Sequence, residues 1–200
     1  MTTIVLASSN QKKLQELQAM LAGKAVTFVP QTNFNITDAV EDGQSFVANA
    51  LIKAQHASRL TGLPALADDS GLEVDSLGGA PGIYSARFAN IHGTGNSSDA
   101  DNNALLLARL VGVPEAQRCA RFRCAIVLVR TADDPLPVIC EGTWEGSILA
   151  AEAGSNGFGY DPLFFVPTHG CASAQLSAVV KNSISHRAQA LQLLLQRWPF

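Results

Sequence analysis

The sequence predicts an α/β fold in which a mixed sheet is flanked by helices. In the first half of the chain, short runs of β-branched and apolar residues alternate with segments whose apolar residues recur at helical spacing. In the second half, two long strand-like runs are separated by a short turn, a pattern typical of antiparallel neighbours. Both observations favour a sheet with helices packed against it.

The composition limits the classes of function that the chain can have. Its 200 residues suit one domain, and the apolar share of 47% is enough for a substantial core. The net charge of -3 provides no basic field, so we expect no nucleic-acid partner and no membrane partner. Because we find no signal-peptide pattern and no membrane-spanning run, a cytoplasmic location is expected. The four cysteines include no Cys-x-x-Cys pair, which favours reduced thiols over a zinc site.

The first elements are a strand, a polar turn and a helix. Residues 3–7 are a β-branched apolar run, and the polar residues 8–10 interrupt it. Apolar residues three and four apart then predict a helix over 11–21. Lys12 and Lys13 lie in its first turn, where positive charge opposes the helix dipole. A bound phosphate would explain them, and two solvated surface lysines are the alternative.

A second strand and a long helix follow. The strand is expected at residues 26–29, and the helix at residues 46–60, with Gly62 ending it. Glu41 precedes this helix and Lys53 lies on it. Glu41 could simply place a favourable charge near a helix start, and Lys53 is one basic candidate that could equally lie on the surface.

An acidic stretch follows the third apolar run. Residues 63–66 are expected to form a buried strand, with Asp68 and Asp69 at its end. Because neighbouring side chains of an extended chain point to opposite faces, we expect these two carboxylates to have different roles. Carboxylates at a strand end are typical ligands of Mg²⁺. A solvated acidic turn is the alternative.

The second half contains a further helix, two long strands and several glycine-rich loops. The helix is expected at 99–110 and the long strands at 119–129 and 138–144, with an extension of the second toward 149. Glycine and proline density predicts loops rather than regular elements at 78–87, 93–98 and 154–162. A short strand at 163–166 follows the last of these loops.

Two features near the C-terminus suggest ligand binding. Phe158 lies in the last glycine-rich loop, from which it could stack on a nucleobase or, alternatively, fill the core. Ser183 or Ser185 can begin the final helix, so His186 and Arg187 again place positive charge against a helix dipole. Lysines at a turn, paired acids, a framed aromatic ring and a basic cluster each suit one part of a nucleoside triphosphate.

Five motifs in this order give the chain a close resemblance to the inosine/xanthosine triphosphate pyrophosphatase family, in its bacterial form, the dITP/XTP pyrophosphatases. They are Ser8-Ser9-Asn10-Gln11-Lys12-Lys13, Ala67-Asp68-Asp69-Ser70-Gly71-Leu72, Gly79-Ala80-Pro81-Gly82-Ile83-Tyr84-Ser85-Ala86-Arg87, Phe158-Gly159-Tyr160-Asp161-Pro162 and Ser185-His186-Arg187. The resemblance extends nearly from end to end. It implies one nucleoside triphosphate pyrophosphatase domain over residues 1–200, with an elongated mixed sheet, two lobes around a central cleft and a homodimeric state.

The resemblance also implies a reaction and a set of site residues. The reaction is the Mg²⁺-dependent hydrolysis of ITP, dITP and XTP to the monophosphate and pyrophosphate, which cleanses the nucleotide pool. Asp69 is implied as the proton acceptor for the attacking water and, with Glu41, as a metal ligand, while Asp68 supports the same centre. The implied substrate-binding residues are Ser8, Ser9, Asn10, Gln11, Lys12 and Lys13 for the phosphates, Ser70 for the nucleotide, Phe158, Gly159 and Tyr160 at the base, and Asp161, Lys181, His186 and Arg187 around its edge.

Two departures from the family pattern have structural consequences. Ser9 replaces a glycine that is often found in the first motif, so the turn is expected to be less permissive. Residues 178–180 are apolar where relatives usually have acids. We therefore expect Lys181 to lack nearby counter-charges.

Three other functions are compatible with parts of this pattern. A related pyrophosphatase could prefer modified pyrimidines or methylated bases, although the Phe158 and His186-Arg187 motifs argue against it. A nucleotide sensor without turnover would need neither Asp69 nor Glu41. A purely structural dimer module would leave both basic clusters at helix N-termini unexplained.

Overall fold

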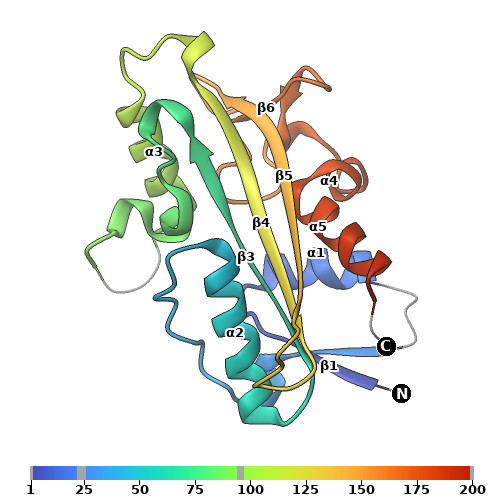
Figure 1. Ribbon diagram of the computed structural model, residues 1–200. Coiled ribbons are helices and arrows are strands. Elements are labelled where there is room, and N and C mark those ends of the chain that lie inside the picture. Colours follow the sequence, from blue (N-terminus) through green and yellow to red (C-terminus); the bar gives the residue numbers. More distant parts are fainter. Residues whose placement is uncertain (1, 22–25, 94–96, 199–200) are drawn as a thin grey trace. The chain divides into compact units, whose positions relative to one another are not determined.

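A computed structural model describes residues 2–21, 26–93 and 97–198 of the chain (Figure 1). The strands are β1 (Thr2–Leu6), β2 (Val26–Pro30), β3 (Ala65–Val74), β4 (Cys119–Val129), β5 (Val138–Ile148), β6 (Phe164–Val166) and β7 (Cys171–Ala172). The α-helices are α1 (Gln11–Leu21), α2 (Phe46–Thr61), α3 (Asp99–Arg109), α4 (Ala178–Ile184) and α5 (His186–Gln196). None of the described helices combines the length and the apolar character needed to cross a membrane.

The described strands form one mixed sheet, in the order β2-β1-β3-β4-β5-β6-β7. Strand β1 pairs in parallel with β2 and β3, whereas β6 pairs antiparallel with β5 and β7. Both kinds of pairing occur, so the predicted mixed α/β fold is confirmed.

The chain folds into two compact units. The first comprises Met1–Asp69, Cys124–Gly142 and Arg187–Phe200, and the second comprises Ser70–Arg123 and Thr143–His186. Strands β3, β4 and β5 each contribute residues to both units. The central cleft and the single domain over residues 1–200 stay predictions.

In the first unit, helices cover both faces of the sheet (Figure 1). Side chains alternate along β1, so Ile4 packs with leucines of α1 and α5, while Val5 packs with alanines of α2. The α2 residues Ala50 and Ala54 are fully buried in this second cluster. Small side chains at these positions let helix α2 lie close to β3, which carries the two aspartates.

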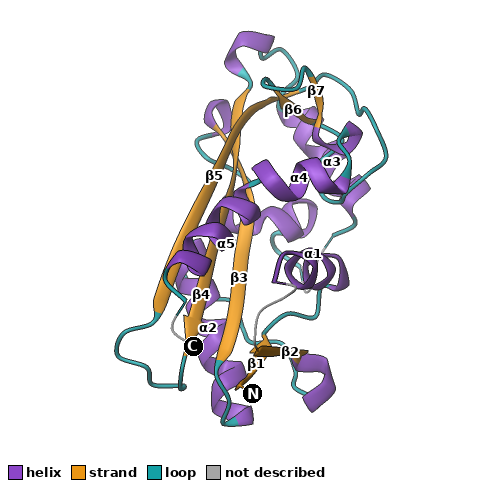
Figure 2. Cartoon of the chain, turned by 90° about the vertical axis from the view of Figure 1, so that its right-hand side faces the viewer, coloured by secondary structure: helices purple, strands orange, loops and turns teal. Residues whose placement is uncertain are grey.

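In the second unit, aromatic rings from neighbouring strands form the centre of the core. Phe122 of β4 and Phe164 of β6 have ring centroids 4.6 Å apart, and Trp144 of β5 lies 5.2 Å from Phe164. Leu106 of α3 belongs to the same cluster. The short strands β6 and β7 lie side by side at the edge of the sheet (Figure 2). This core supports the loop that carries Phe158.

Most of the predicted elements are confirmed. Helix α1 and strand β4 have the predicted bounds, and α3 is one residue shorter than predicted. Gly62 ends α2 with a φ of 70°, and the side chain of Ser45 begins that helix by accepting from the Ala48 N–H. The four cysteines are free thiols, and burial raises the pKa of Cys124 to about 12.

Three features differ from the predictions, and part of one predicted loop lies outside the described residues. Strand β3 does not end at the acids but continues to Val74, so Asp68 and Asp69 lie inside it. Helix α4 was missed; the Ser177 side chain begins it by accepting from the Val180 N–H. Within the loop predicted at 78–87, 3-10 turns begin at Gly82. Part of the loop predicted at 93–98 lies outside the described residues.

Candidate active site

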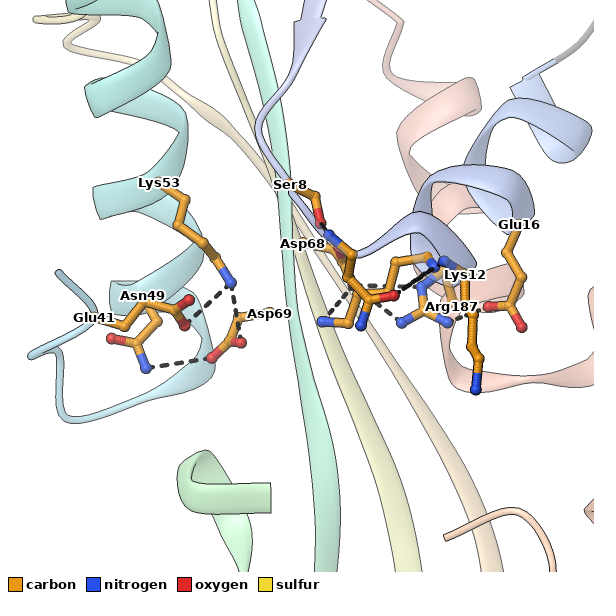
Figure 3. A network of polar contacts seen from close by, with 11 residues as sticks. Ser8, Lys12, Glu16, Glu41, Asn49, Lys53, Asp68, Asp69 and Arg187 are labelled. Atoms are coloured by element: carbon orange, nitrogen blue, oxygen red, sulfur yellow. Dashed lines mark hydrogen bonds and ion pairs between the residues drawn. The ribbon is translucent and has the colours of Figure 1, made fainter. Parts of the chain in front are cut away.

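Strand β3 directs two neighbouring carboxylates to opposite faces of the sheet (Figure 3). Asp68 faces α1 and α5 and pairs with Lys13 and Arg187, while Asp69 faces α2 and pairs with Lys53. Both aspartates are buried, at 2% and 7% exposure. The expectation that the two side chains point to opposite faces is confirmed, and they share no cation among these contacts. That they have different roles stays a prediction. The acidic turn is excluded as an alternative.

On the α2 face, one lysine joins two carboxylates. Lys53 Nζ lies 3.1 Å from Asp69 Oδ1 and 3.2 Å from Glu41 Oε2. Burial alone would lower the pKa of Lys53, but the carboxylates of Asp69 and Glu41 raise it above its ordinary value. Lys53 therefore stays protonated. Its ammonium group contacts both acids that are implied as metal ligands.

The chemistry of these acids fits a magnesium ion. Mg²⁺ binds few protein carboxylates and completes its coordination with water and substrate phosphate. Glu41 and Asp69 provide two carboxylates that already reach the same cation. Among residues 2–21, 26–93 and 97–198, no group of three or more His, Cys, Asp or Glu side chains is placed to hold a metal by itself.

On the opposite face, Asp68 lies in a buried ion-pair network. Arg187 donates from Nη2 and Nε to Asp68 Oδ2 at 3.1 and 3.3 Å, and its Nη1 donates to Glu16. Lys13 Nζ lies 3.4 Å from the same Asp68 oxygen. Burial would raise the pKa of Asp68, but Lys13 and Arg187 hold it well below its usual range. The network links α1, β3 and α5 within the first unit.

The turn between β1 and α1 is fixed by its own polar side chains. Asn10 Oδ1 accepts from the backbone N–H groups of Lys12 and Lys13 at 3.0 and 3.1 Å, and Ser8 Oγ accepts from the Asn10 N–H at 3.2 Å. The Asn10 oxygen therefore caps helix α1. The NH₂ group of the Asn10 side chain can donate to a phosphate. Gln11 and Lys12, which follow in the sequence, are exposed.

The residue that replaces the usual glycine makes a contact of its own. Ser9 Oγ donates to Asp38 Oδ2 at 2.6 Å, and Gln31 Nε2 donates to Asp38 Oδ1 at 2.5 Å. Asp38 lies three residues before Glu41. Ser9 thus ties the turn expected to bind phosphate to the segment that carries a candidate metal ligand.

In the second unit, Asp161 organises the loop of Phe158. Asp161 Oδ2 accepts from the Phe158 N–H at 2.9 Å and from Lys181 Nζ at 2.6 Å, while its Oδ1 accepts from Ser173 Oγ at 2.9 Å. The prediction that Lys181 lacks a nearby counter-charge is therefore wrong. Its partner comes from the glycine-rich loop, 20 residues away in the sequence, and not from the residues that directly precede it.

Phe158 lies beside this ion pair and is only partly buried. It is not among the core residues of the second unit, so it does not fill the core as the alternative required. Lys181 Nζ lies 5.0 Å from the centroid of its ring. A cation over one part of the ring helps to fix its orientation.

The remaining base-site candidates mainly have structural contacts. Tyr160 Oη donates to the Ser85 carbonyl at 2.8 Å, and burial raises the pKa of Tyr160 above its usual range. The Gly159 N–H donates to Asp99 at 2.8 Å. His186 stacks on Phe122 with centroids 4.8 Å apart. Ser70 follows Asp69 in β3 and is partly buried.

The structure adds residues that the sequence analysis missed or left undecided. Lys53 was considered a surface residue or a basic candidate, and it contacts both acids. Asn49 was not considered, yet its Nδ2 donates to Asp69 Oδ2 at 3.3 Å. Because positions four apart lie on one face of a helix, this pair could have been recognised once Lys53 was placed at the site. No sequence signal distinguishes Glu16, the partner of Arg187.

Comparison with known proteins places this arrangement in a family. Residues 4–197 match the model of the Ham1 family. Proteins named dITP/XTP pyrophosphatase from Pseudomonas syringae and Vibrio cholerae are 58% and 54% identical to the chain, over 98% of it and over 97% and 96% of their own lengths. The structure of a HAM1 protein from Coxiella burnetii matches with a TM-score of 0.90 and 48% identity, over 98% of both chains. The chain belongs to the Ham1 family.

Proposed function

We propose that this protein hydrolyses deaminated purine nucleoside triphosphates (ITP, dITP and XTP) to the monophosphate and pyrophosphate, and so cleanses the nucleotide pool. The observation that carries this proposal is the identity of 58% over nearly the whole chain to a protein named dITP/XTP pyrophosphatase. The buried acids and lysines of the first unit supply groups suited to phosphate chemistry.

Glu41 and Asp69 would hold Mg²⁺. When bound, the ion would neutralise phosphate charge and lower the pKa of a coordinated water. Lys53, which contacts both carboxylates, would neutralise them when the ion is absent and would add positive charge beside a phosphate held by the ion. Oxygen ligands and a neighbouring cation are the groups that phosphoryl transfer requires.

Asp69 would accept the proton of the attacking water. It is buried, and two side chains of α2 fix its carboxylate. A general base must be held within hydrogen-bonding distance of the proton that it removes, and the two contacts from α2 would help to hold Asp69 in such a position. Asp68 has a different role, because its paired Lys13 and Arg187 keep it charged and hold the phosphate-binding helix in place.

The turn from Ser8 to Lys13 would bind the phosphates. Its helix N-terminus, the Asn10 amide and the lysines all carry positive charge or hydrogen-bond donors. Lys13 already pairs with Asp68, so a phosphate would compete with that carboxylate for it. The geometry of the turn supports binding through several donors and not through one lysine.

Base recognition would fall to the loop of Phe158. Phe158 would stack on the base, while Asp161 would act chiefly by holding the Phe158 backbone and Lys181, since both of its oxygens accept hydrogen bonds from the protein. Lys181, His186 and Arg187 stay candidates for contacts with the base edge. Donors at that edge favour a 6-keto purine over adenine, because adenine presents a donor there.

A homodimer and a cytoplasmic location complete the proposal. Both derive from the resemblance to the family, and static light scattering on the purified protein would test the dimer.

The product pattern tests the reaction most simply. Purified protein is incubated with dITP and Mg²⁺, and the products are separated by ion-exchange chromatography. The proposal predicts dIMP and pyrophosphate in equal amounts. Formation of dIDP and orthophosphate would show a different cleavage and contradict it.

A further inference from the structure

Helix α2 presents two side chains, one turn apart, to the same carboxylate. Lys53 Nζ contacts Asp69 Oδ1 at 3.1 Å, and Asn49 Nδ2 donates to Asp69 Oδ2 at 3.3 Å (Figure 3). Each oxygen of the carboxylate is therefore held from a different position of one rigid helix. This arrangement fixes the rotation of the carboxylate as well as its location.

Both side chains also reach the segment that carries Glu41. Lys53 pairs with Glu41 itself, and Asn49 Oδ1 accepts from the Gly43 N–H at 2.9 Å. The Asn49 amide thus has one end on Asp69 and the other on the backbone two residues after Glu41. Only one orientation of the amide satisfies both contacts, because the reverse would oppose two oxygens at Asp69 and two donors at Gly43.

The fit around Asn49 is close. Its side chain is 1% exposed, and a Cβ added at Gly43 would lie 2.7 Å from Asn49 Oδ1 and 2.8 Å from the Ala48 Cβ. Any larger residue at position 43 would therefore displace the amide or the segment. The absence of a side chain at Gly43 allows the backbone to approach Asn49.

Neither a carboxylate nor an apolar side chain at position 49 would preserve both contacts. Aspartate would keep the acceptor for Gly43 but would place a second carboxylate against Asp69. Leucine would leave the Gly43 N–H without its acceptor and Asp69 without its donor. A metal ion could replace Lys53 as the cation that contacts Asp69 and Glu41. Asn49 is neutral, so its contact with Asp69 does not compete with that cation.

We propose that Asn49 is a positioning residue that fixes Asp69 and the Glu41 segment relative to each other, independently of the cation between the two acids. The two acids come from a loop and from a strand, and Asn49 is a neutral contact that joins the supports of both. This inference rests on the proposed function for its kinetic consequences but not for its effect on metal binding. Outer partners of metal-binding carboxylates commonly contribute to affinity and activity in this way.

The test compares Asn49→Ala with a matched control, Asn102→Ala. Asn102 is also a buried helical asparagine with two contacts, to the Ala89 N–H and the Ala86 carbonyl, both of which are backbone groups and not acids. Asn49→Ala is expected to lower kcat for ITP by about 10- to 100-fold while KM changes by less than about threefold. Asn102→Ala is expected to change neither constant, although both variants lower the free energy of unfolding.

A second readout does not depend on turnover. Binding of Mn²⁺ alone, followed through the electron paramagnetic resonance signal of the free ion, is expected to weaken by about 10- to 100-fold in Asn49→Ala and not in Asn102→Ala. If the wild-type protein releases no pyrophosphate from ITP, the proposed function fails while this measurement still decides the role of Asn49. Unchanged Mn²⁺ affinity in Asn49→Ala, or an equal loss in Asn102→Ala, would overturn the inference.

Two further variants distinguish the contact of the Asn49 oxygen from that of its nitrogen. They also test the proposal if Asn49→Ala does not fold. Asn49→Asp retains the acceptor for the Gly43 N–H, so full kcat in this variant would show that only the loop contact matters and would contradict the proposal. Gly43→Ala leaves Asn49 in place but crowds its oxygen. The proposal predicts that Gly43→Ala also weakens Mn²⁺ binding, and wild-type affinity in that variant would contradict it.

Discussion

Asp68 and Asp69 are neighbours in one strand, yet each carboxylate pairs with a different lysine: Lys13 Nζ lies 3.4 Å from Asp68, and Lys53 Nζ lies 3.1 Å from Asp69. The alternation of side chains along β3 produces this separation. One carboxylate is locked in a buried network with Arg187, and the other shares its cation with Glu41. We therefore expect replacement by asparagine to have different effects at Asp68 and at Asp69.

Asp69→Asn should abolish most of the turnover while the fold is retained. The amide cannot accept the proton of the attacking water, and loss of a general base typically lowers a rate by about 10²- to 10⁴-fold. Steady-state release of pyrophosphate from ITP measures the loss, and thermal unfolding followed by circular dichroism checks the fold. Near-normal activity of a folded variant would refute the assignment of Asp69 as the base.

Asp68→Asn should act mainly on stability. Removal of this charge leaves Arg187 buried without one of its carboxylate partners, which typically costs about 3–5 kcal/mol of unfolding free energy. Asp133→Asn is the control, because Asp133 pairs with Arg59 at the surface and its loss should cost less than about 1 kcal/mol. Urea unfolding at neutral pH measures both, and equal effects would contradict the buried network.

The lowered pKa of Asp68 predicts how the free energy of unfolding depends on pH. The pKa of Asp68 is lower in the folded protein than its ordinary value of 3.8, so its contribution is fully present above that value. The contribution is lost as pH falls below 3.8 toward the folded-state pKa. Urea unfolding between about pH 5 and pH 2 should therefore show a flatter profile for Asp68→Asn than for the wild-type protein. Parallel profiles would contradict this linkage.

Lys53→Met should make the protein more responsive to magnesium. Without the ammonium group, Asp69 and Glu41 lack the cation that they share, so a bound ion can replace it. Mg²⁺ should then raise the thermal midpoint of Lys53→Met more than that of the wild-type protein. Lys13→Met is the control, because Asp68 retains Arg187 in that variant. An equal Mg²⁺ effect in all three proteins would argue against a metal at these acids.

Gly157→Ala should disturb the Phe158 loop. Gly157 has a φ of 77°, and a Cβ there would collide with the Asp161 carboxylate that holds Phe158 and Lys181. If stacking on the base is lost, about 1–3 kcal/mol disappears, which corresponds to a KM for ITP higher by about 5- to 150-fold. Gly170→Ala is the control, since Gly170 has a similar φ of 64° but no atom near the added Cβ. Equal changes in KM would assign the effect to backbone strain alone.

The fold was largely predictable because its signals are local. The leucine spacing of α1 and the apolar end of β4 identify those elements with their observed bounds. The extent of β3 was not predictable, because adjacent carboxylates disfavour a buried strand unless distant cations pair with them. Lys13 and Lys53, which supply this pairing, lie at least 15 residues before the strand's two aspartates.

Residues of the candidate site could be predicted from the sequence, but the side chains with which they pair could not. The family resemblance implied Asp69 and Glu41, whose shared contact with Lys53 depends on the packing of α2 on β3. Arg187 was expected at the base edge, and the structure pairs it with Asp68 and Glu16 in the first unit. Which partner a buried cation finds is decided by tertiary packing, and spacing in one sequence does not carry that information.

Initial rates of pyrophosphate release from ITP, XTP, ATP and GTP, with Mg²⁺ and with EDTA, test the proposed reaction, its substrates and its metal together. We expect fast, Mg²⁺-dependent release from ITP and XTP, and slow release from ATP because donors at the base edge oppose the adenine amino group. Slow release from GTP is expected from the proposed preference for deaminated purines. Equal release from all four would contradict base recognition through the Phe158 loop. No release from any of them would contradict the proposed activity and favour a nucleotide sensor or an enzyme for modified pyrimidines.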